Sequence, residues 1–231
     1  MADVTVYGFP ISAFVNIVRL VLTHKEVAFD FHDLEPELGS PTHLSLHPFN
    51  RVPILDHAGF RIYETSAIAL YVDEVFDGPA LQQGLAPARQ DVSMDQCAEQ
   101  LLLPLHVLSF EPRTPDLSCT RDCSRRKGGR PPLPRITVAL DVMERELRTD
   151  TVYLLGDQLT LADFFVLPTM TSLSMTPEGQ EMLKSRPRIG AWRARMEAQP
   201  AVTKVRATVA PHIGKPVEHA RKWVETHRPR Y

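Results

Sequence analysis

The strongest constraint on the fold is a proline that opens a short apolar run, in the segment Asn50-Arg51-Val52-Pro53-Ile54-Leu55. Proline supplies no N–H to a sheet, so it is seldom found in an inner strand. The position makes sense if the Val52–Pro53 bond is cis and the strand borders a site, since cis X-Pro bonds are uncommon. The N–H and C=O of Val52 would then be free to pair with an extended peptide ligand.

A second feature follows shortly afterwards, where Tyr63-Glu64-Thr65-Ser66-Ala67-Ile68 begins a helical pattern. The N-terminus of a helix favours a carboxylate, because its first N–H groups have no partner within the helix and a hydroxyl lies beside them. Val52 together with Glu64 and Thr65 therefore predicts a pocket that pairs with a small peptide and holds its acid end.

Residues 1–78 are predicted to form a small α/β domain. Alternating apolar and polar residues indicate strands, and apolar residues at helical spacing indicate helices. The order of these elements predicts a parallel pair of strands next to an antiparallel pair. The predicted strands are 5–8, 27–34, 53–56 and 60–63, and the predicted helices are 12–25, 41–46 and 65–75.

A linker at 79–86 leads to a second half, 87–231, which is predicted to be all-helical. Thr160 and Asp163 form a variant of the capping box: the hydroxyl can accept from the Asp163 N–H, and the carboxylate can reach back to the Thr160 N–H. The apolar run Phe164–Met170 suggests that this helix is the buried centre of the domain. Further helices are predicted at 87–108, 136–147, 187–199 and 201–212.

The segment 110–135 departs from this helical pattern. Prolines at 112, 115, 131, 132 and 134 forbid a continuous helix there, and a Gly-Gly pair and a basic cluster accompany them. Two explanations stay open. The segment is a loop or disordered region peculiar to this protein, or it is a locally altered sequence such as a compensated frameshift.

Composition narrows the class of protein. The 231 residues carry a net charge of −2, which gives no general attraction to nucleic acid or anionic membranes. No apolar run is long enough to span a bilayer, and the N-terminus leads directly into a predicted strand rather than a signal segment. Three cysteines do not make a disulfide framework. We therefore expect a cytoplasmic protein with no membrane or nucleic-acid partner.

Four motifs, in this order and at these distances, make the chain resemble the cytosolic glutathione S-transferases of the serine-using type (phi/theta-like or bacterial). The resemblance implies a thioredoxin-like N-terminal domain followed by an all-helical C-terminal bundle. It also implies a homodimer that takes glutathione as co-substrate and a small hydrophobic electrophile, as in detoxification. The motifs are Gly8-Phe9-Pro10-Ile11-Ser12, His47-Pro48-Phe49-Asn50-Arg51-Val52-Pro53, Glu64-Thr65-Ser66-Ala67-Ile68 and Gly156-Asp157-Gln158-Leu159-Thr160-Leu161-Ala162-Asp163.

By this resemblance, Ser12 is the catalytic residue. Its hydroxyl would donate a hydrogen bond to the glutathione sulfur, whose free thiol has a pKa of about 8.5, and the N-terminal dipole of the following helix would favour the thiolate. Serine also caps helices well, so a purely structural role is the alternative. Tyr7 is a competing partner for the thiol, although its place inside a strand favours a core role.

The glutathione-binding residues are carried over in the same way. Val52 would contact the cysteinyl backbone beside the cis residue Pro53, while Glu64 would hold the γ-glutamyl ammonium and Thr65 its carboxylate. The His-Lys pair that often holds the glycyl carboxylate is replaced by Leu38 and Gly39, and the Gln before Val-Pro by Arg51. Arg51 can supply the missing positive charge, because a guanidinium pairs well with carboxylates, or it is a solvated surface residue.

The electrophile pocket is expected to include Phe14, His106 and Phe110. No metal is expected: His43 and His47 have helical spacing but no third ligand. Cys119 and Cys123, with His106, do not fit zinc spacing either.

The function predicted first is glutathione conjugation by thiolate attack. Glutathione-dependent peroxide reduction, dehalogenation and isomerisation would use the same site. The alternative from another class is a non-catalytic relative that keeps the scaffold as a binding or regulatory protein.

Overall fold

The computed structural model describes residues 2–82, 133–147 and 151–214. The chain forms two compact units, one of Met1–Gly84 with Arg195–Tyr231 and one of Leu85–Ala194. This grouping by spatial contact places the last helix with the N-terminal unit. The predicted domain limits 1–78, 79–86 and 87–231 are continuous stretches of the sequence, and they stay a prediction.

The first unit contains a mixed four-stranded sheet with the order β2-β1-β3-β4. Strand β1 is parallel to β2 and antiparallel to β3, and β3 is antiparallel to β4, which confirms the predicted arrangement. The β3–β4 turn consists of Ala58 and Gly59, whose φ values of 51° and 88° suit the two-residue hairpin turns that match strand twist. The strands are β1 (Val4–Gly8), β2 (Asp30–Asp33), β3 (Ile54–His57) and β4 (Phe60–Tyr63).

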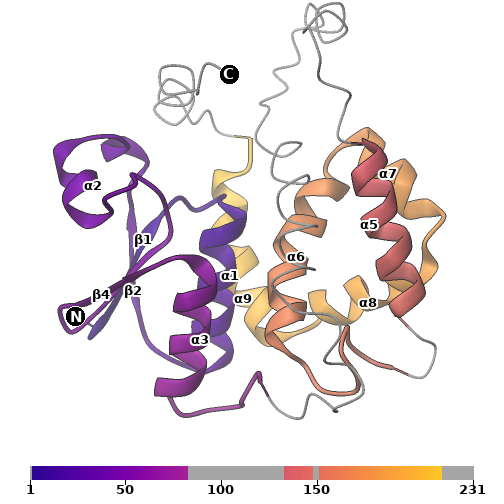
Figure 1. Cartoon of the computed structure of the whole chain (residues 1–231), viewed down its shortest axis with the longest axis horizontal. Coiled ribbons are helices and arrows are strands. Elements are labelled where there is room, and N and C mark those ends of the chain that lie inside the picture. The colour runs from indigo at the N-terminus through magenta and orange to yellow at the C-terminus, as the bar shows by residue number, and fades with distance from the viewer. Residues whose placement is uncertain (1, 83–132, 148–150, 215–231) are drawn as a thin grey trace, which may run out of the picture. The chain divides into compact units, whose positions relative to one another are not determined.

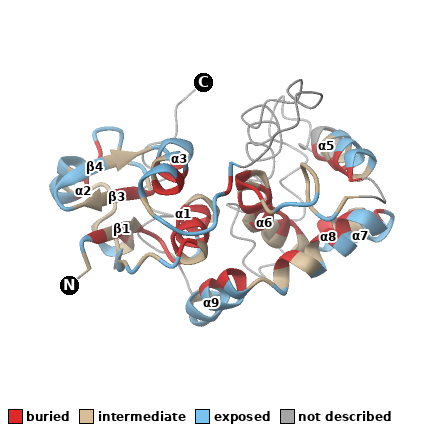
Figure 2. Ribbon diagram, turned by 90° about the horizontal axis from the view of Figure 1, so that it is seen from below, coloured by how far each residue is buried: buried red, intermediate tan, exposed pale blue. Residues whose placement is uncertain are grey.

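Helices α1 and α3 lie on one side of this sheet and α2 on the other, as Figure 1 shows. Helix α1 packs against α3 and against α9, and it is buried along most of its length (Figure 2). These helices agree closely with the predicted ranges, and short 3₁₀ turns occupy Glu35–Glu37 and Ala210–His212. The helices are α1 (Ala13–His24), α2 (Pro41–Leu46), α3 (Thr65–Val75) and α9 (Pro200–Val209).

A buried ion pair fixes the C-terminal end of α1, the end remote from Ser12. Lys25 Nζ lies 3.2 Å from Asp73 Oδ1 and donates to the Asp73 carbonyl at 2.9 Å, and the same carboxylate oxygen accepts from the Leu81 N–H at 2.9 Å. The two charged side chains are 2% and 3% exposed, so each depends on the other for compensation. The pair therefore joins α1, α3 and the segment that follows α3.

We predict that Asp73→Ala lowers the free energy of unfolding by about 3–5 kcal/mol, because it leaves the Lys25 ammonium buried without its counter-ion. Glu74→Ala, at the neighbouring exposed position, is the control and should change stability by less than about 0.5 kcal/mol. Urea denaturation followed by circular dichroism measures both variants. Equal stability of the two variants would contradict this role for the ion pair.

The second unit is helical in its described part. Helix α5 begins at Leu133, three residues before the predicted start at 136 and inside the segment 110–135, because Pro134 is tolerated in the first turn of a helix. Helix α7 has no counterpart among the predicted elements. The predicted helix 87–108 lies outside the described residues. The helices are α5 (Leu133–Glu146), α6 (Leu161–Ser174), α7 (Pro177–Lys184) and α8 (Pro187–Glu197).

Asp163 is the polar centre of this unit. Its carboxylate accepts from the Thr160 N–H at 3.0 Å, the Thr160 hydroxyl at 2.9 Å, the Leu154 N–H at 3.0 Å and the Trp192 indole at 2.8 Å. The predicted capping box at the start of α6 is present. Burial raises the pKa of Asp163, and these hydrogen bonds offset part of that effect. One side chain thus joins α6, α8 and the loop before α6.

Asp163→Asn should destabilise the protein by several kcal/mol, roughly 2–4, although it removes a buried charge. In either orientation the amide nitrogen of asparagine would face at least one N–H group that only donates, so at least one hydrogen bond is replaced by a clash of donors. Asp157→Asn, at an exposed position, serves as the matched control. Thermal unfolding of the two variants makes the comparison, and an unchanged midpoint for Asp163→Asn would show that the carboxylate is dispensable.

Among the described residues, no helix combines the length and the apolar character that crossing a membrane requires.

Candidate active site

Ser12 is the residue that immediately precedes α1. Its Oγ accepts from the Val15 N–H at 3.4 Å, and its own N–H donates to the Phe9 carbonyl at 3.1 Å, which closes a turn. The residue is 7% exposed. As an N-cap, Ser12 uses a lone pair of its oxygen and keeps its O–H proton available for donation. Capping and thiol activation are therefore compatible in one side chain.

The electrostatic surroundings of Ser12 favour an anion. The first turn of α1 contains no acidic residue, so the partial positive charge of the helix N-terminus is not cancelled there. A thiolate next to the Ser12 hydroxyl would face both the hydroxyl proton and this helix end. Both effects stabilise the charged form of the sulfur and lower its pKa.

The Val52–Pro53 peptide bond is cis, as the sequence predicts. Strand β3 begins only at Ile54, which pairs with Tyr7 of β1 and Tyr63 of β4, so Val52 lies outside both ladders. The Val52 side chain packs against the core cluster of Phe9, Leu34 and Ile54. Its backbone N–H and C=O are thus held in place and left out of the sheet, as pairing with a peptide requires.

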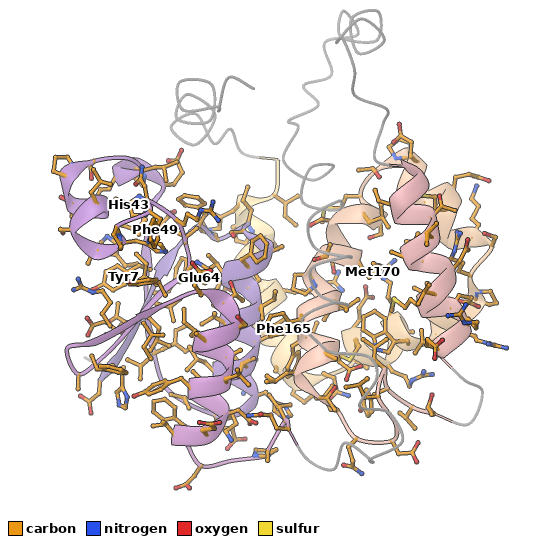
Figure 3. All side chains as sticks on the ribbon, viewed as in Figure 1. Tyr7, His43, Phe49, Glu64, Phe165 and Met170 are labelled. Carbon is orange, nitrogen blue, oxygen red and sulfur yellow. The ribbon has the colours of Figure 1, made fainter. Side chains whose placement is uncertain are left out.

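Glu64 and Thr65 lie at the start of α3, and Figure 3 shows Glu64 at this helix end. Glu64 has a φ of 75°, a conformation that is uncommon for a residue with a Cβ and that clusters at functional sites. No side chain caps the helix, so its first N–H groups stay open to a ligand carboxylate. Thr65 is 9% exposed and Glu64 is exposed, so the acid can reach a ligand ammonium.

Two histidines form hydrogen bonds with the backbone of the loop before Pro53. His43 accepts from the Gly39 N–H at 3.3 Å through Nδ1, and its Nε2 lies 3.0 Å from the carbonyl oxygen of Arg51. The Phe49 N–H donates to His47 Nδ1 at 3.1 Å. Both ring nitrogens of His43 are thereby engaged, and among residues 2–82, 133–147 and 151–214 no group of three or more possible metal ligands occurs.

The charges around the site affect the pKa of His47. Burial lowers the pKa of His47, the nearby Glu64 carboxylate raises it in part, and His43 and Arg51 lower it further. The lowered pKa favours the neutral form of the His47 imidazole.

The replacements at the expected His-Lys positions have a clear structural basis. Leu38 packs against the same core cluster as Val52, so a charged residue there would be poorly solvated. Gly39 has a φ of 79°, which glycine adopts without strain. Arg51 is exposed and, within the described part of the chain, forms no ion pair. Its guanidinium could therefore pair with a ligand carboxylate.

Tyr7 has a core role in the structure. Its side chain packs against the Phe9, Leu34 and Ile54 cluster, and its ring lies 5.3 Å from that of His32. Phe14 is half-buried in the first turn of α1. The other two predicted pocket residues, His106 and Phe110, lie outside the described residues, as do Cys119 and Cys123.

Sequence reasoning missed the polar side chains that support the turn before α1. Asn16 and Arg19 lie among apolar residues on the buried face of this helix. A polar pair three residues apart on an apolar helix face is the signal that would have indicated them.

Comparisons with known proteins agree with this geometry. Residues 2–74 match the family model described as "Glutathione S-transferase, N-terminal domain", and residues 132–200 match "Glutathione S-transferase, C-terminal domain". The chain is 31% identical to glutathione S-transferase 4 of Zea mays over 224 residues, which cover 93% of this chain and 97% of that protein. It is 30% identical to glutathione S-transferase PARB of Nicotiana tabacum over 209 residues, 87% of this chain and 96% of that one.

Solved structures show the same likeness. Glutathione S-transferase III in its apo form aligns with a TM-score of 0.73 and 26% identity, over 92% of this chain and 98% of that one. Glutathione S-transferase-I bound with lactoylglutathione aligns with a TM-score of 0.72 and 25% identity, over 89% and 99%.

Fold and site together define a glutathione-binding, thioredoxin-like protein with a helical second part. The chain belongs to the glutathione S-transferase family, and the predicted family and fold class are confirmed.

Proposed function

We propose that this glutathione transferase conjugates glutathione to a small hydrophobic electrophile, and that the Ser12 hydroxyl stabilises the attacking thiolate. The observation that supports this role most strongly is the position of Ser12 at the N-terminus of α1, where its O–H donates to no group among the described residues. The thiolate, not the thiol, is the nucleophile. A hydrogen bond to a charged group contributes about 1.5–3 kcal/mol, which corresponds to a fall of about 1–2 units in the thiol pKa.

The rest of the glutathione molecule is proposed to bind along residues 51–65. The Val52 backbone would pair with the cysteinyl backbone, because both of its polar groups lie outside the sheet. Glu64 would hold the γ-glutamyl ammonium, and the open N-terminus of α3 with Thr65 would hold the carboxylate. Arg51 would pair with the glycyl carboxylate in place of the missing His-Lys pair.

Ser12→Ala should raise the pKa of the bound glutathione thiol by about 1–2 units and slow conjugation of an aryl halide by a similar factor, about 10- to 100-fold, at pH 7. Binding of glutathione should change little. Because the substitution also removes a helix cap, Thr176→Ala is the control: Thr176 caps α7 in the other unit by accepting from the Gly179 N–H at 3.0 Å. Stability should fall by a similar amount in both variants, and only Ser12→Ala should lose activity.

Arg51→Ala should raise the KM for glutathione about three- to tenfold and leave kcat nearly unchanged, since an exposed ion pair contributes to ground-state binding. The effect should shrink at high salt because the pair is screened. Lys204→Ala, another exposed cation of the same unit, is the control. A KM that is identical in wild type and Arg51→Ala would return Arg51 to the role of a solvated surface residue.

A non-catalytic binding or regulatory relative was the alternative. The curated relatives, which this chain matches over nearly their whole length, are named glutathione S-transferase. This favours the enzyme over the non-catalytic alternative. Peroxide reduction, dehalogenation and isomerisation share the thiolate step, and a panel of such substrates distinguishes them.

Further parts of the proposal follow from the family. We propose a cytoplasmic homodimer without a bound metal, whose electrophile pocket includes Phe14, His106 and Phe110. Phe49 is 66% exposed and would contribute apolar contact to the subunit interface (Figure 3). Light scattering after size-exclusion chromatography tests the dimer, and a monomeric mass at micromolar concentration would contradict it.

A further inference from the structure

Two polar side chains interrupt the apolar face of α1. Every residue from Val15 to Leu22 is buried, and within this run Asn16 is 9% exposed and Arg19 only 5%. Burying an amide or a guanidinium among apolar groups is costly unless hydrogen bonds compensate. Asn16 and Arg19 therefore need hydrogen-bond partners on the packed face of the helix. These partners connect them to the turn that contains Ser12.

A chain of hydrogen bonds runs from α9 to this turn. Arg19 Nη2 donates to the Thr208 hydroxyl on α9, and Arg19 Nη1 donates to Asn16 Oδ1 at 3.1 Å. Asn16 Nδ2 in turn donates to the Pro10 carbonyl at 3.0 Å. The guanidinium also lies 4.5 Å above the centre of the Phe31 ring. Pro10 is two residues before Ser12, so this chain ends in the turn that carries the hydroxyl.

The chemistry of the three groups fixes the orientation of the Asn16 amide. A guanidinium only donates, so it must face the amide oxygen, and a backbone carbonyl only accepts, so it must face the amide nitrogen. Rotating the amide would bring donor against donor and acceptor against acceptor. Arg19 thus determines which end of Asn16 points to Pro10.

The Ser12 carbonyl accepts from the Asn16 N–H at 2.9 Å, the first bond of α1, but few bonds hold the turn before it. The bond from the Val15 N–H to Ser12 Oγ is 3.4 Å, beyond the usual range for an N–H···O bond, and Pro10 has no N–H to contribute. Ser12 N–H to Phe9 carbonyl, at 3.1 Å, is the backbone bond within the turn. The Asn16 bond to Pro10 is shorter than either of these two bonds.

We propose that Asn16 is a positioning residue for catalysis, which holds the Pro10–Ser12 turn so that the Ser12 hydroxyl meets the glutathione sulfur, and that Arg19 orients Asn16 for this purpose. The inference rests on the proposed function of Ser12. It also links α9 to the active-site turn through Thr208.

The decisive readout is the pKa of the thiol in bound glutathione, measured by the ultraviolet absorbance of the thiolate as pH is varied. Two variants of Asn16 are compared because each removes the bond to Pro10 in a different way. Asn16→Leu is neutral and has a similar size. Asn16→Asp keeps a partner for Arg19 but donates nothing to the Pro10 carbonyl, so the helix stays packed.

Both variants should raise the thiol pKa by about half a unit or more and lower kcat at pH 7 by about threefold or more. The KM for glutathione should stay within about twofold, because the contacts of Val52 and Glu64 are untouched. Val18→Ala is the stability control: Val18 is fully buried on the same helix, and its truncation should cost stability without moving the thiol pKa. A rise in Asn16→Asp alone would reflect only its added charge and would overturn the proposal.

A double-mutant cycle separates this inference from the function on which it rests. If Asn16 acts through Ser12, Asn16→Leu should have no further effect on the thiol pKa in the Ser12→Ala background. If Ser12→Ala raises the pKa and neither Asn16 variant does, Asn16 is merely structural and the inference fails while the proposed function stands. If Ser12→Ala itself leaves the pKa unchanged, the role of Ser12 fails, and that of Asn16 fails with it.

Discussion

The burial of α1 is the constraint on which the rest of the first unit depends. This helix packs against α3 and α9, and its buried face is apolar except for Asn16 and Arg19. Its C-terminal end is fixed by the ion pair of Lys25 with Asp73, and its N-terminal end presents Ser12. Because the interior of a protein is closely packed, a helix held in this way can present one hydroxyl at a defined position.

The site consists largely of backbone N–H and C=O groups that form no hydrogen bond within a helix or sheet. Val52 comes just before β3 and keeps its N–H and C=O, and the first N–H groups of α1 and α3 have no partner within their helices. Such groups are rigid because the elements behind them are packed, so they recognise a ligand at small entropic cost. The arrangement suits a small peptide with charged ends, whose ammonium and glycyl carboxylate are proposed to pair with the exposed side chains of Glu64 and Arg51.

Much of this was predictable from local sequence signals. Proline before β3, the capping box of Thr160 and Asp163 and the periodicity of α1 and α3 each have one strong local cause, so the sequence predicts them correctly. Contacts between distant residues have no such local signal. Three features depend on tertiary packing and became visible only in the structure. They are the hydrogen bond from Arg19 to Thr208, the hydrogen bond between His43 and the Arg51 carbonyl, and the positive φ of Glu64. Helix α7 was missed because its eight residues are fewer than the stretch over which helical periodicity is judged, although Thr176 as its N-cap and Pro177 in its first turn are local signals of a helix start.

Glutathione is proposed to ionise when it binds beside the Ser12 hydroxyl. Calorimetric titration with reduced glutathione near pH 7, in two buffers that differ in ionisation enthalpy, gives the number of protons released on binding. We expect release of a substantial fraction of one proton per site, because the free thiol, with a pKa of about 8.5, is still mostly protonated at this pH. S-methylglutathione, which has no thiol, should bind without this release. Equal proton release with both ligands, or none with either, would show that the thiol does not ionise on binding.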